Sequence, residues 1–178
     1  LNTTMPKNLF ITFNPNEHTE QNTAQRLQTI AHLYQISVEL PTRMGVRGSQ
    51  PSEETQARIQ RAGIVLAICL EKMSPLLRNE LTYAMQQQKT IVVLYDKING
   101  ERINFGDYQH VREVHIDFEQ TDKSLQEVAA FLQSELHKKA KAEAAAEAKK
   151  AQEQNAMILG LVGIGLGLLA LWAFTSED

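Results

Sequence analysis

Short apolar runs alternate with amphipathic stretches between residues 7 and 136 of the chain. Continuous apolar runs are typical of strands covered on both faces, and apolar residues three or four apart are typical of helices. Five runs predict strands, at residues 9–13, 36–40, 64–70, 90–95 and 111–118. Helices are predicted between them, at residues 17–34, 52–62 and 74–88, and after the last strand around residues 125–136.

This alternation predicts one α/β domain over residues 7–136, preceded by a disordered N-terminus at residues 1–6. Strand–helix–strand units with right-handed crossovers form a parallel sheet with helices on both faces. We therefore expect a flavodoxin-like, five-stranded parallel sheet in the order 2-1-3-4-5. Ligands bind beyond the carboxyl ends of such strands, so the loops at 14–17, 41–52, 71–74 and 96–99 form the expected edge of a site.

The segment from 137 to 155 is rich in alanine and charged residues and has no apolar stripe. This composition predicts a solvated helical spacer that continues the last helix of the domain, with a coiled-coil seam as the alternative. Residues 156–174 carry no charge and would reach roughly 28 Å as a helix, close to the thickness of a bilayer core. They predict one C-terminal transmembrane helix with a short tail at 175–178, the alternative being a buried core helix.

The charges beside this predicted span indicate its orientation. Five lysines precede it, while only Glu177 and Asp178 follow it. The positive-inside rule then leaves the domain in the cytoplasm, as a single-pass protein with a C-terminal anchor. Gly163 and Gly167 lie four residues apart and offer a small-residue face through which two spans could associate.

Composition removes several classes of function. The net charge is −3, from 18 basic and 21 acidic residues, so no basic excess indicates a nucleic-acid partner. The single cysteine, Cys69, excludes a disulfide scaffold and a zinc site built from several thiolates. Cys69 lies in an apolar run and is expected to be a buried core thiol. No metal motif and no phosphate-binding loop is present, so no metal site is expected.

One carboxylate lies inside an apolar stripe of a predicted helix. The four positions three and four residues from Glu80 are apolar or aromatic, namely Leu76, Leu77, Tyr83 and Ala84. Burial would raise the pKa of this carboxyl, so that it could exchange a proton or accept hydroxyls from a bound sugar. The structural alternative is an ion pair with Arg78 or with an arginine of the 41–52 loop.

The segment around Glu80 resembles the Toll/interleukin receptor (TIR) family, especially the TIR-like domains of bacterial immune systems, over residues 7–136. Ser74-Pro-Leu-Leu-Arg-Asn-Glu-Leu-Thr-Tyr-Ala84 is similar to the family element Ser-x-Trp-x-x-x-Glu-x-x-x-Ala. The loop at 41–52 looks like the BB loop of the family. Two departures are Leu76, where the family has an aromatic residue, and Phe13-Asn14, where the first strand usually ends in Ser-Tyr-Ser.

The resemblance implies that Glu80 is catalytic and holds the nicotinamide ribose of NAD, which is a substrate and not a cofactor. The implied nucleotide-binding residues are Phe13, Asn14, Arg43, Arg47 and Leu76. Nicotinamide would be released by hydrolysis or cyclisation, in bacterial antiviral defence or signalling at the inner membrane. The domain would act as a homo-oligomer together with an unidentified sensor or effector protein.

Three other functions are consistent with the same residues. A non-catalytic TIR scaffold or adaptor would act by oligomerising alone. A nucleoside deoxyribosyltransferase-like enzyme would also place a glutamate on a sugar. A membrane effector would use the assembled domains to cluster the spans and disturb the bilayer.

Overall fold

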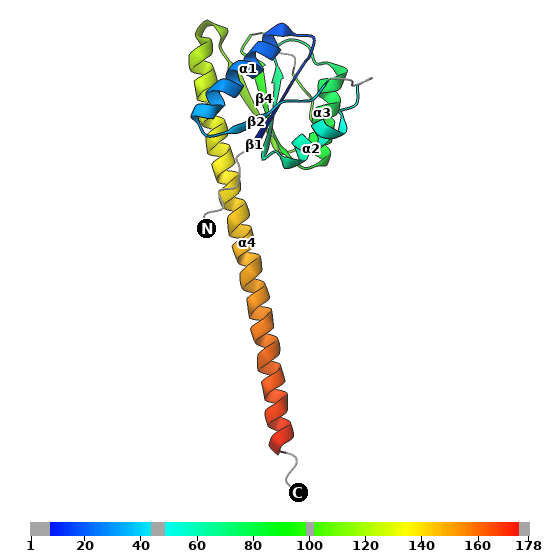
Figure 1. Ribbon diagram of the computed structural model, residues 1–178, viewed down its shortest axis with the longest axis vertical. Coiled ribbons are helices and arrows are strands. Elements are labelled where there is room, and N and C mark those ends of the chain that lie inside the picture. The colour runs from blue at the N-terminus through cyan, green and yellow to red at the C-terminus, as the bar shows by residue number, and fades with distance from the viewer. Residues whose placement is uncertain (1–7, 44–48, 99–101, 175–178) are drawn as a thin grey trace. The chain divides into compact units, whose positions relative to one another are not determined.

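The computed structural model describes residues 8–43, 49–98 and 102–174 of the chain, with residues 155–174 described as backbone only. Its strands are β1 (Asn8–Phe13), β2 (Ser37–Glu39), β3 (Ile64–Cys69), β4 (Thr90–Asp96) and β5 (Val111–Ile116). Its helices are α1 (His18–Leu33), α2 (Glu53–Arg61), α3 (Pro75–Gln86) and α4 (Thr121–Phe174), with a short 3-10 turn, η1 (Phe118–Gln120), before α4 (Figure 1).

The five strands form one sheet in the order β2-β1-β3-β4-β5, and every neighbouring pair is parallel. The predicted flavodoxin-like order is therefore confirmed. β1 lies between β2 and β3. The connection from β1 leads to β2 on one side of it, and the next connection leads to β3 on its opposite side. This reversal makes the carboxyl ends of β1 and β3 the topological switch point, where open sheets of this kind bind ligands.

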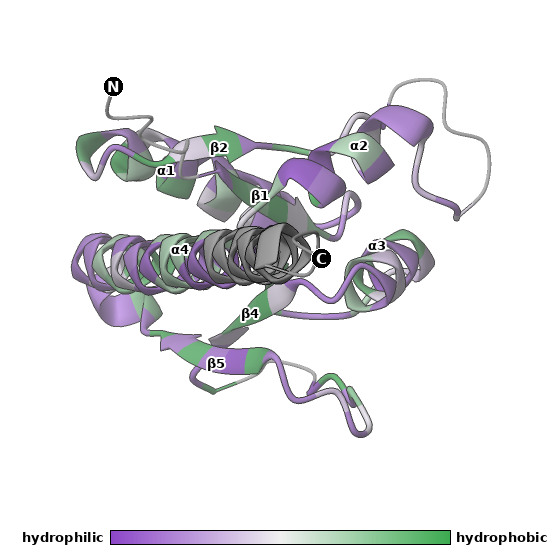
Figure 2. Cartoon of the chain, turned by 90° about the horizontal axis from the view of Figure 1, so that it is seen from below, coloured by the Kyte–Doolittle hydropathy of each residue, from purple (hydrophilic) through white to green (hydrophobic). Residues whose placement is uncertain are grey.

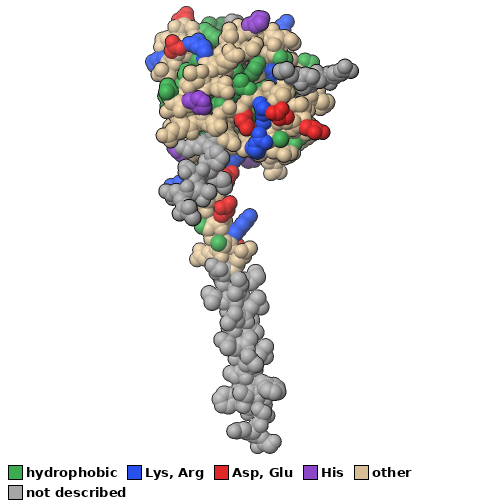
Figure 3. Space-filling view, in the orientation of Figure 1, with side chains coloured by type: hydrophobic (Ala, Val, Ile, Leu, Met, Phe, Trp, Pro, Cys, Tyr) green, Lys and Arg blue, Asp and Glu red, His purple; other side chains and the backbone are tan. Residues whose placement is uncertain are grey.

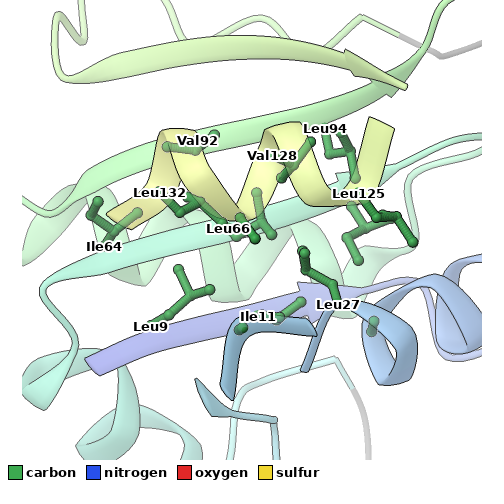
Figure 4. Packing of buried hydrophobic residues seen from close by; sticks show 14 of the residues in the cluster. Leu9, Ile11, Leu27, Ile64, Leu66, Val92, Leu94, Leu125, Val128 and Leu132 are labelled. Carbon is green, nitrogen blue, oxygen red and sulfur yellow. The ribbon is translucent and has the colours of Figure 1, made fainter. Parts of the chain in front are cut away.

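Two apolar layers cover the two faces of the sheet. On one face, side chains of α1 and of the first turns of α4 pack against Leu9, Ile11, Leu66 and Val92 (Figure 4). On the other face, residues of α2 and α3 pack against alternate positions of the same strands, among them Phe10 and Val65. Figure 2 shows the strands between these two pairs of helices. The alternation of side chains along each strand thus produces two separate cores.

The central strands have the burial that their continuous apolar sequences predict. All six residues of β3 are buried, including the thiol of Cys69, which confirms the prediction of a core cysteine. In β4 the ring of Tyr95 is also buried, and its hydroxyl accepts a hydrogen bond from the backbone N–H of Ile103 (2.9 Å). That bond fixes part of the irregular connection between β4 and β5.

Two edge strands are shorter than predicted, and β3 ends one residue early, at Cys69 instead of residue 70. The fifth ends at Ile116 instead of residue 118, because the side chain of Asp117 accepts a hydrogen bond from the N–H of Glu119 (3.0 Å) and starts the 3-10 turn. The second covers only Ser37–Glu39, although the apolar pattern extends from 36 to 40. Both are edge strands, where pairing on one side alone gives weaker support to their ends.

The chain divides into two compact units, Leu1–His137 and Lys138–Asp178. The first contains the sheet and the packed turns of α4, and the second continues that helix through the predicted spacer. Among the residues whose side chains are described, no helix is long and apolar enough to cross a membrane. The predicted span at 156–174, with Gly163 and Gly167, lies outside these side chains, as do the termini predicted at 1–6 and 175–178.

The surface of the first unit has charged side chains of both signs. On the face drawn in Figure 3, basic and acidic side chains lie next to one another, with apolar side chains between them. Ion pairs of the first unit include those of Arg26 with Asp122 and of Arg102 with Glu113 (2.5 Å), whose side chains are largely exposed. Such exposed pairs contribute little to stability.

Candidate functional site around Glu80

Glu80 reaches the sheet from the second turn of α3. This helix begins directly after the loop that follows β3, where the side chain of Ser74 caps the N–H of Leu77 (3.1 Å) and Pro75 occupies the first turn. Glu80 shares the inward face of α3 with Leu77 and Ala84, and its side chain is only 1% exposed. The apolar stripe noted in the sequence therefore buries this carboxylate completely.

The two oxygens of the Glu80 carboxylate have different surroundings. Oε2 accepts hydrogen bonds from the hydroxyl of Thr12, in β1, and from Nη2 of Arg43 (3.0 Å). Oε1 is buried and has no hydrogen-bond partner among the described residues. The hydrogen bonds to Oε2 thus fix the orientation of the carboxylate, and Oε1 can still accept a hydrogen bond from a ligand.

Arg43 comes from the loop between β2 and α2, so the structure gives Glu80 the loop-arginine partner that we considered as an alternative, and not Arg78. Its Nη2 also donates to the carbonyl oxygen of Phe13 (2.7 Å), and its guanidinium lies 4.7 Å from the centre of the Phe13 ring. Nε and Nη1 of Arg43 are buried without a partner among the described residues. Arg43 therefore pairs with Glu80 and still has two nitrogen atoms, with three N–H groups, that can donate to a ligand.

The backbone beside Arg43 is fixed by the start of α2. The N–H of Thr42 donates to the hydroxyl of Thr55 (3.0 Å), and the hydroxyl of Ser52 donates to the carbonyl of Thr42 (3.0 Å). Ser52 is also the N-cap of α2. The same polar residues that begin this helix thus hold the chain that carries the guanidinium.

Burial raises the pKa of the Glu80 carboxyl above its ordinary value. The positive charge of Arg43 opposes this change, as do the hydrogen bonds from Thr12 and from Arg43. Desolvation is the larger effect, because the surrounding side chains of α3 and β1 exclude water from the carboxylate. Buried carboxyls with a raised pKa and a specific charged partner, at the carboxyl ends of the strands, are common in catalytic and binding sites.

A second buried glutamate, Glu20 of α1, lies on the other face of the sheet at the same end of β1. Its Oε2 accepts the N–H of Asn14 (2.7 Å), and its Oε1 accepts the N–H groups of Leu70 (2.8 Å) and Glu71 (3.3 Å). Burial raises the pKa of Glu20, and the three backbone hydrogen bonds oppose that rise. Glu20 links the turn after β1 to the turn after β3.

The remaining predicted site residues are not all beside Glu80. Phe13 and Arg43 are joined to it by the contacts above, whereas Asn14 is buried among the turns, where its Nδ2 donates to the carbonyl of Lys72 (2.8 Å). Leu76 is half-buried in the first turn of α3. Arg47 lies outside the described residues.

Thr12 and Glu20 were not identified from the sequence. Thr12 is a polar residue at an inward-facing position of an apolar strand, two residues after Phe10, and this could have indicated a partner for a buried polar group. Glu20 is four residues before Ala24 on the buried side of α1, but its neighbours are mostly polar, so the apolar stripe that indicated Glu80 is absent there.

A cavity of about 260 Å³ lies along a different side of α3 and does not include Glu80. It is lined by residues of α3 and of the β4–β5 connection, among them Arg78, Leu81, Arg102 and Phe105. Among the residues that the structure describes, no group of three or more His, Cys, Asp or Glu side chains is arranged to hold a metal ion. Glu80 itself offers a desolvated carboxylate beside a guanidinium and a hydroxyl.

No family model matches the sequence, and no curated protein matches it significantly. Among solved structures, the CMP N-glycosidase BcmB of Clostridium botulinum is similar with a TM-score of 0.52 and 14% identity, over 70% of this chain and 99% of the other. A flavodoxin-like domain from Synechococcus sp. has a TM-score of 0.48 and 11% identity, over 72% and 94% of the two chains. The TIR domains of the activated Roq1 resistosome have a TM-score of 0.41 and 13% identity, over 75% and 83%.

The likeness to BcmB shows a common fold and no more, because so low an identity does not carry residue roles from one chain to another. The other two likenesses are weaker still. The function of the chain must therefore be argued from the geometry around Glu80.

Proposed function

We propose that the chain cleaves the N-glycosidic bond of a nucleotide, with NAD as its substrate and Glu80 as the residue that holds the ribose. The observation that carries this proposal is the carboxylate of Glu80, which is buried and oriented through Oε2 while Oε1 has no described partner. An ionised carboxylate oxygen accepts hydrogen bonds only, so the natural ligand for Oε1 is a hydroxyl donor such as that of a ribose.

The reaction would proceed by breaking the bond between C1′ of the ribose and the pyridinium nitrogen. The electron pair leaves with nicotinamide, and positive charge develops over C1′ and the ring oxygen of the sugar. A buried carboxylate that binds the ribose hydroxyls stabilises this charge more strongly than water would, because the surroundings are of low dielectric. Water, or an adenine nitrogen of the same molecule, then adds to C1′ to give ADP-ribose or a cyclic isomer.

The leaving group favours NAD over other nucleotides. Nicotinamide departs from its cationic nitrogen as a neutral molecule and needs no proton, whereas a pyrimidine departs as an anion unless an acid protonates it. Among the described residues, the side chains hydrogen-bonded to Glu80 are those of Thr12, whose hydroxyl is a weak acid, and of Arg43, which stays protonated. A single carboxylate cannot both hold the ribose as an anion and act as the acid for the leaving base.

A nucleotide N-glycosidase acting on CMP or a deoxynucleoside is the second candidate. The common fold with the CMP N-glycosidase BcmB, at a TM-score of 0.52, is the observation that favours it. In that reaction Glu80, with its raised pKa, would donate a proton to the departing base. The same residue would be required, but a different substrate would be consumed.

Binding of a ribose to Glu80 would involve Arg43. The Glu80 side chain is 1% exposed and that of Arg43 is 17% exposed, and Nη2 of Arg43 lies 3.0 Å from Oε2 of Glu80. In this proposal the Arg43 side chain moves aside when a ribose binds Oε1. Once displaced, the guanidinium stays close enough to bind a phosphate of the substrate, which suits its planar set of donors.

The test is to incubate the purified full chain with NAD, CMP and a deoxynucleoside in separate reactions, and to measure the released base by chromatography. The proposal expects nicotinamide from NAD, with loss of this activity in Glu80→Gln and full activity in Glu53→Gln, an exposed glutamate of α2. Release of cytosine without nicotinamide supports the second candidate. An assembled wild-type chain that leaves all three substrates intact supports the scaffold hypothesis.

The proposal also includes the C-terminal anchor, self-association and a role in bacterial antiviral signalling. Anchoring in a plane would raise the effective concentration of the domains and favour assembly through weak contacts. Removing residues 156–178 should release the chain from membranes while the α/β domain stays folded. A truncated chain that still sediments with membranes would contradict the anchor.

A further inference from the structure

Glu20 connects two loops that are far apart in sequence. Its carboxylate binds the N–H of Asn14 on one side and the N–H groups of Leu70 and Glu71 on the other. All three donors belong to turns at the carboxyl ends of β1 and β3, the switch point of the sheet. Glu20 is completely buried, and among the described residues no cation pairs with it, so these N–H groups are what stabilises its ionised form.

Asn14 extends this connection toward α3. Its Nδ2 donates to the carbonyl of Lys72 (2.8 Å), and its Oδ1 accepts the N–H of Asn16 (3.1 Å). Lys72 lies two residues before Ser74, which caps the helix that carries Glu80. Asn14 itself directly follows Phe13 and Thr12, which contact Arg43 and Glu80.

Glu20 and Asn14 thus form hydrogen bonds that join the end of β1 to the turn before α3, the two segments that carry the candidate site. The end of β1 supplies the hydroxyl and the carbonyl around Glu80 and Arg43, and the turn after β3 sets where α3 begins. We infer that Glu20 and Asn14 act as positioning residues that fix the end of β1 against the start of α3 and so set the geometry of Glu80. This inference deepens the proposed function and rests on it for its catalytic consequence, but its structural consequence can be measured separately.

The experiment compares the full chain with Glu20→Gln, which keeps the size of the side chain but replaces one accepting oxygen with a donor. Glu53→Gln is the matched control, because it removes an exposed carboxylate of α2 that makes none of these backbone bonds. The first measurement is the titration of the Glu80 carboxyl carbon by NMR, together with amide hydrogen exchange at Asn14 and Leu70. The second is kcat and KM for nicotinamide release from NAD.

We expect Glu20→Gln to shift the titration midpoint of Glu80 and to speed the exchange of both amides, while Glu53→Gln changes neither. Where NAD is cleaved, kcat should fall about tenfold with a smaller change in KM, since small displacements of a reacting group have effects of this size. A variant that only melts earlier, with Glu80 titrating as in the wild type, would overturn the inference. Failure of the proposed function appears differently, as a wild-type chain without activity whose Glu80 titration still depends on Glu20.

A second variant covers the case in which Glu20→Gln does not fold. Asn14→Ala keeps the backbone N–H that Glu20 binds but removes the bond to the carbonyl of Lys72. It should also shift the titration midpoint of Glu80, because the turn before α3 loses its link to β1. An unchanged midpoint in this variant would contradict the positioning role.

Discussion

Two buried glutamates lie at the carboxyl end of β1, one on each face of the sheet, and they use their oxygens differently. Glu20 accepts three backbone N–H groups, so both of its oxygens have partners. Glu80 binds Thr12 and Arg43 through one oxygen, and the other has no described partner. Both carboxyls have pKa values raised by burial, so a shifted pKa does not distinguish the two.

The difference lies in what each group can still bind. A carboxylate whose acceptors are all taken by backbone amides is part of the architecture, because a ligand would have to break those bonds. A carboxylate with a spare acceptor, such as Oε1 of Glu80, can bind a ligand without losing a hydrogen bond to the protein. Hydrogen-bond satisfaction therefore separates a structural buried charge from a candidate catalytic one more clearly than burial does.

The sharpest test of this comparison is to replace each glutamate by glutamine and measure NAD cleavage. Glu80→Gln should lower nicotinamide release by two or more orders of magnitude, about 3 kcal/mol or more of transition-state stabilisation, because glutamine cannot supply the negative charge. Glu20→Gln should lower it about tenfold, since it acts only through position. Equal losses in the two variants would remove the distinction between them.

The next test concerns the ion pair between Arg43 and Glu80. Arg43→Gln leaves a buried carboxylate without its cation, so the free energy of unfolding should fall by about 3 kcal/mol in denaturant titrations. The double variant with Glu80→Gln should recover part of that loss, because the uncompensated charge is gone. Arg26→Gln breaks an exposed pair with Asp122 and serves as the control, with an expected change below about 1 kcal/mol.

A smaller loss of stability is expected when the hydroxyl of Thr12, which donates to the Glu80 carboxylate, is removed. Thr12→Val keeps the shape of the side chain but removes the donor to Oε2, so stability should fall by about 1.5 kcal/mol. The pKa of Glu80 should rise further, because a bond that stabilises its charged form is lost. Thr29→Val, at an exposed position of α1, should change neither the unfolding midpoint nor the titration of Glu80.

The smallest effect is the pH dependence of stability. Because the pKa of Glu80 is raised in the folded chain, its favourable contribution is present below the unfolded value, about 4.3, and is lost as pH rises through the folded value. The stability of the wild type relative to Glu80→Gln should therefore decline across this window. NAD cleavage should rise over the same window, since the ionised carboxylate is the active form. A rate that falls instead would indicate that Glu80 acts as an acid.

The sequence predicts the strand order because the apolar runs of β1, β3 and β4 are continuous and the helices between them are clearly amphipathic. It also indicates Glu80, since a carboxylate inside an apolar stripe is rare. It could not show that Arg43, rather than Arg78, is the partner, because that pairing depends on how Arg43 lies against the end of β1. Glu20 escaped notice because its partners are backbone amides, which have no signature in the sequence.

The two edge strands of the sheet, β2 and β5, are shorter or more charged than the central strands, and this affects how copies of the chain could associate. β2 is only three residues long, and β5 exposes Arg112, Glu113 and His115 along its length. Short or charged edge strands are poor templates for a further strand, so copies of this chain are not expected to join their sheets into a continuous one. Self-association, which the proposed function includes, would then use the faces of the helices and the loops.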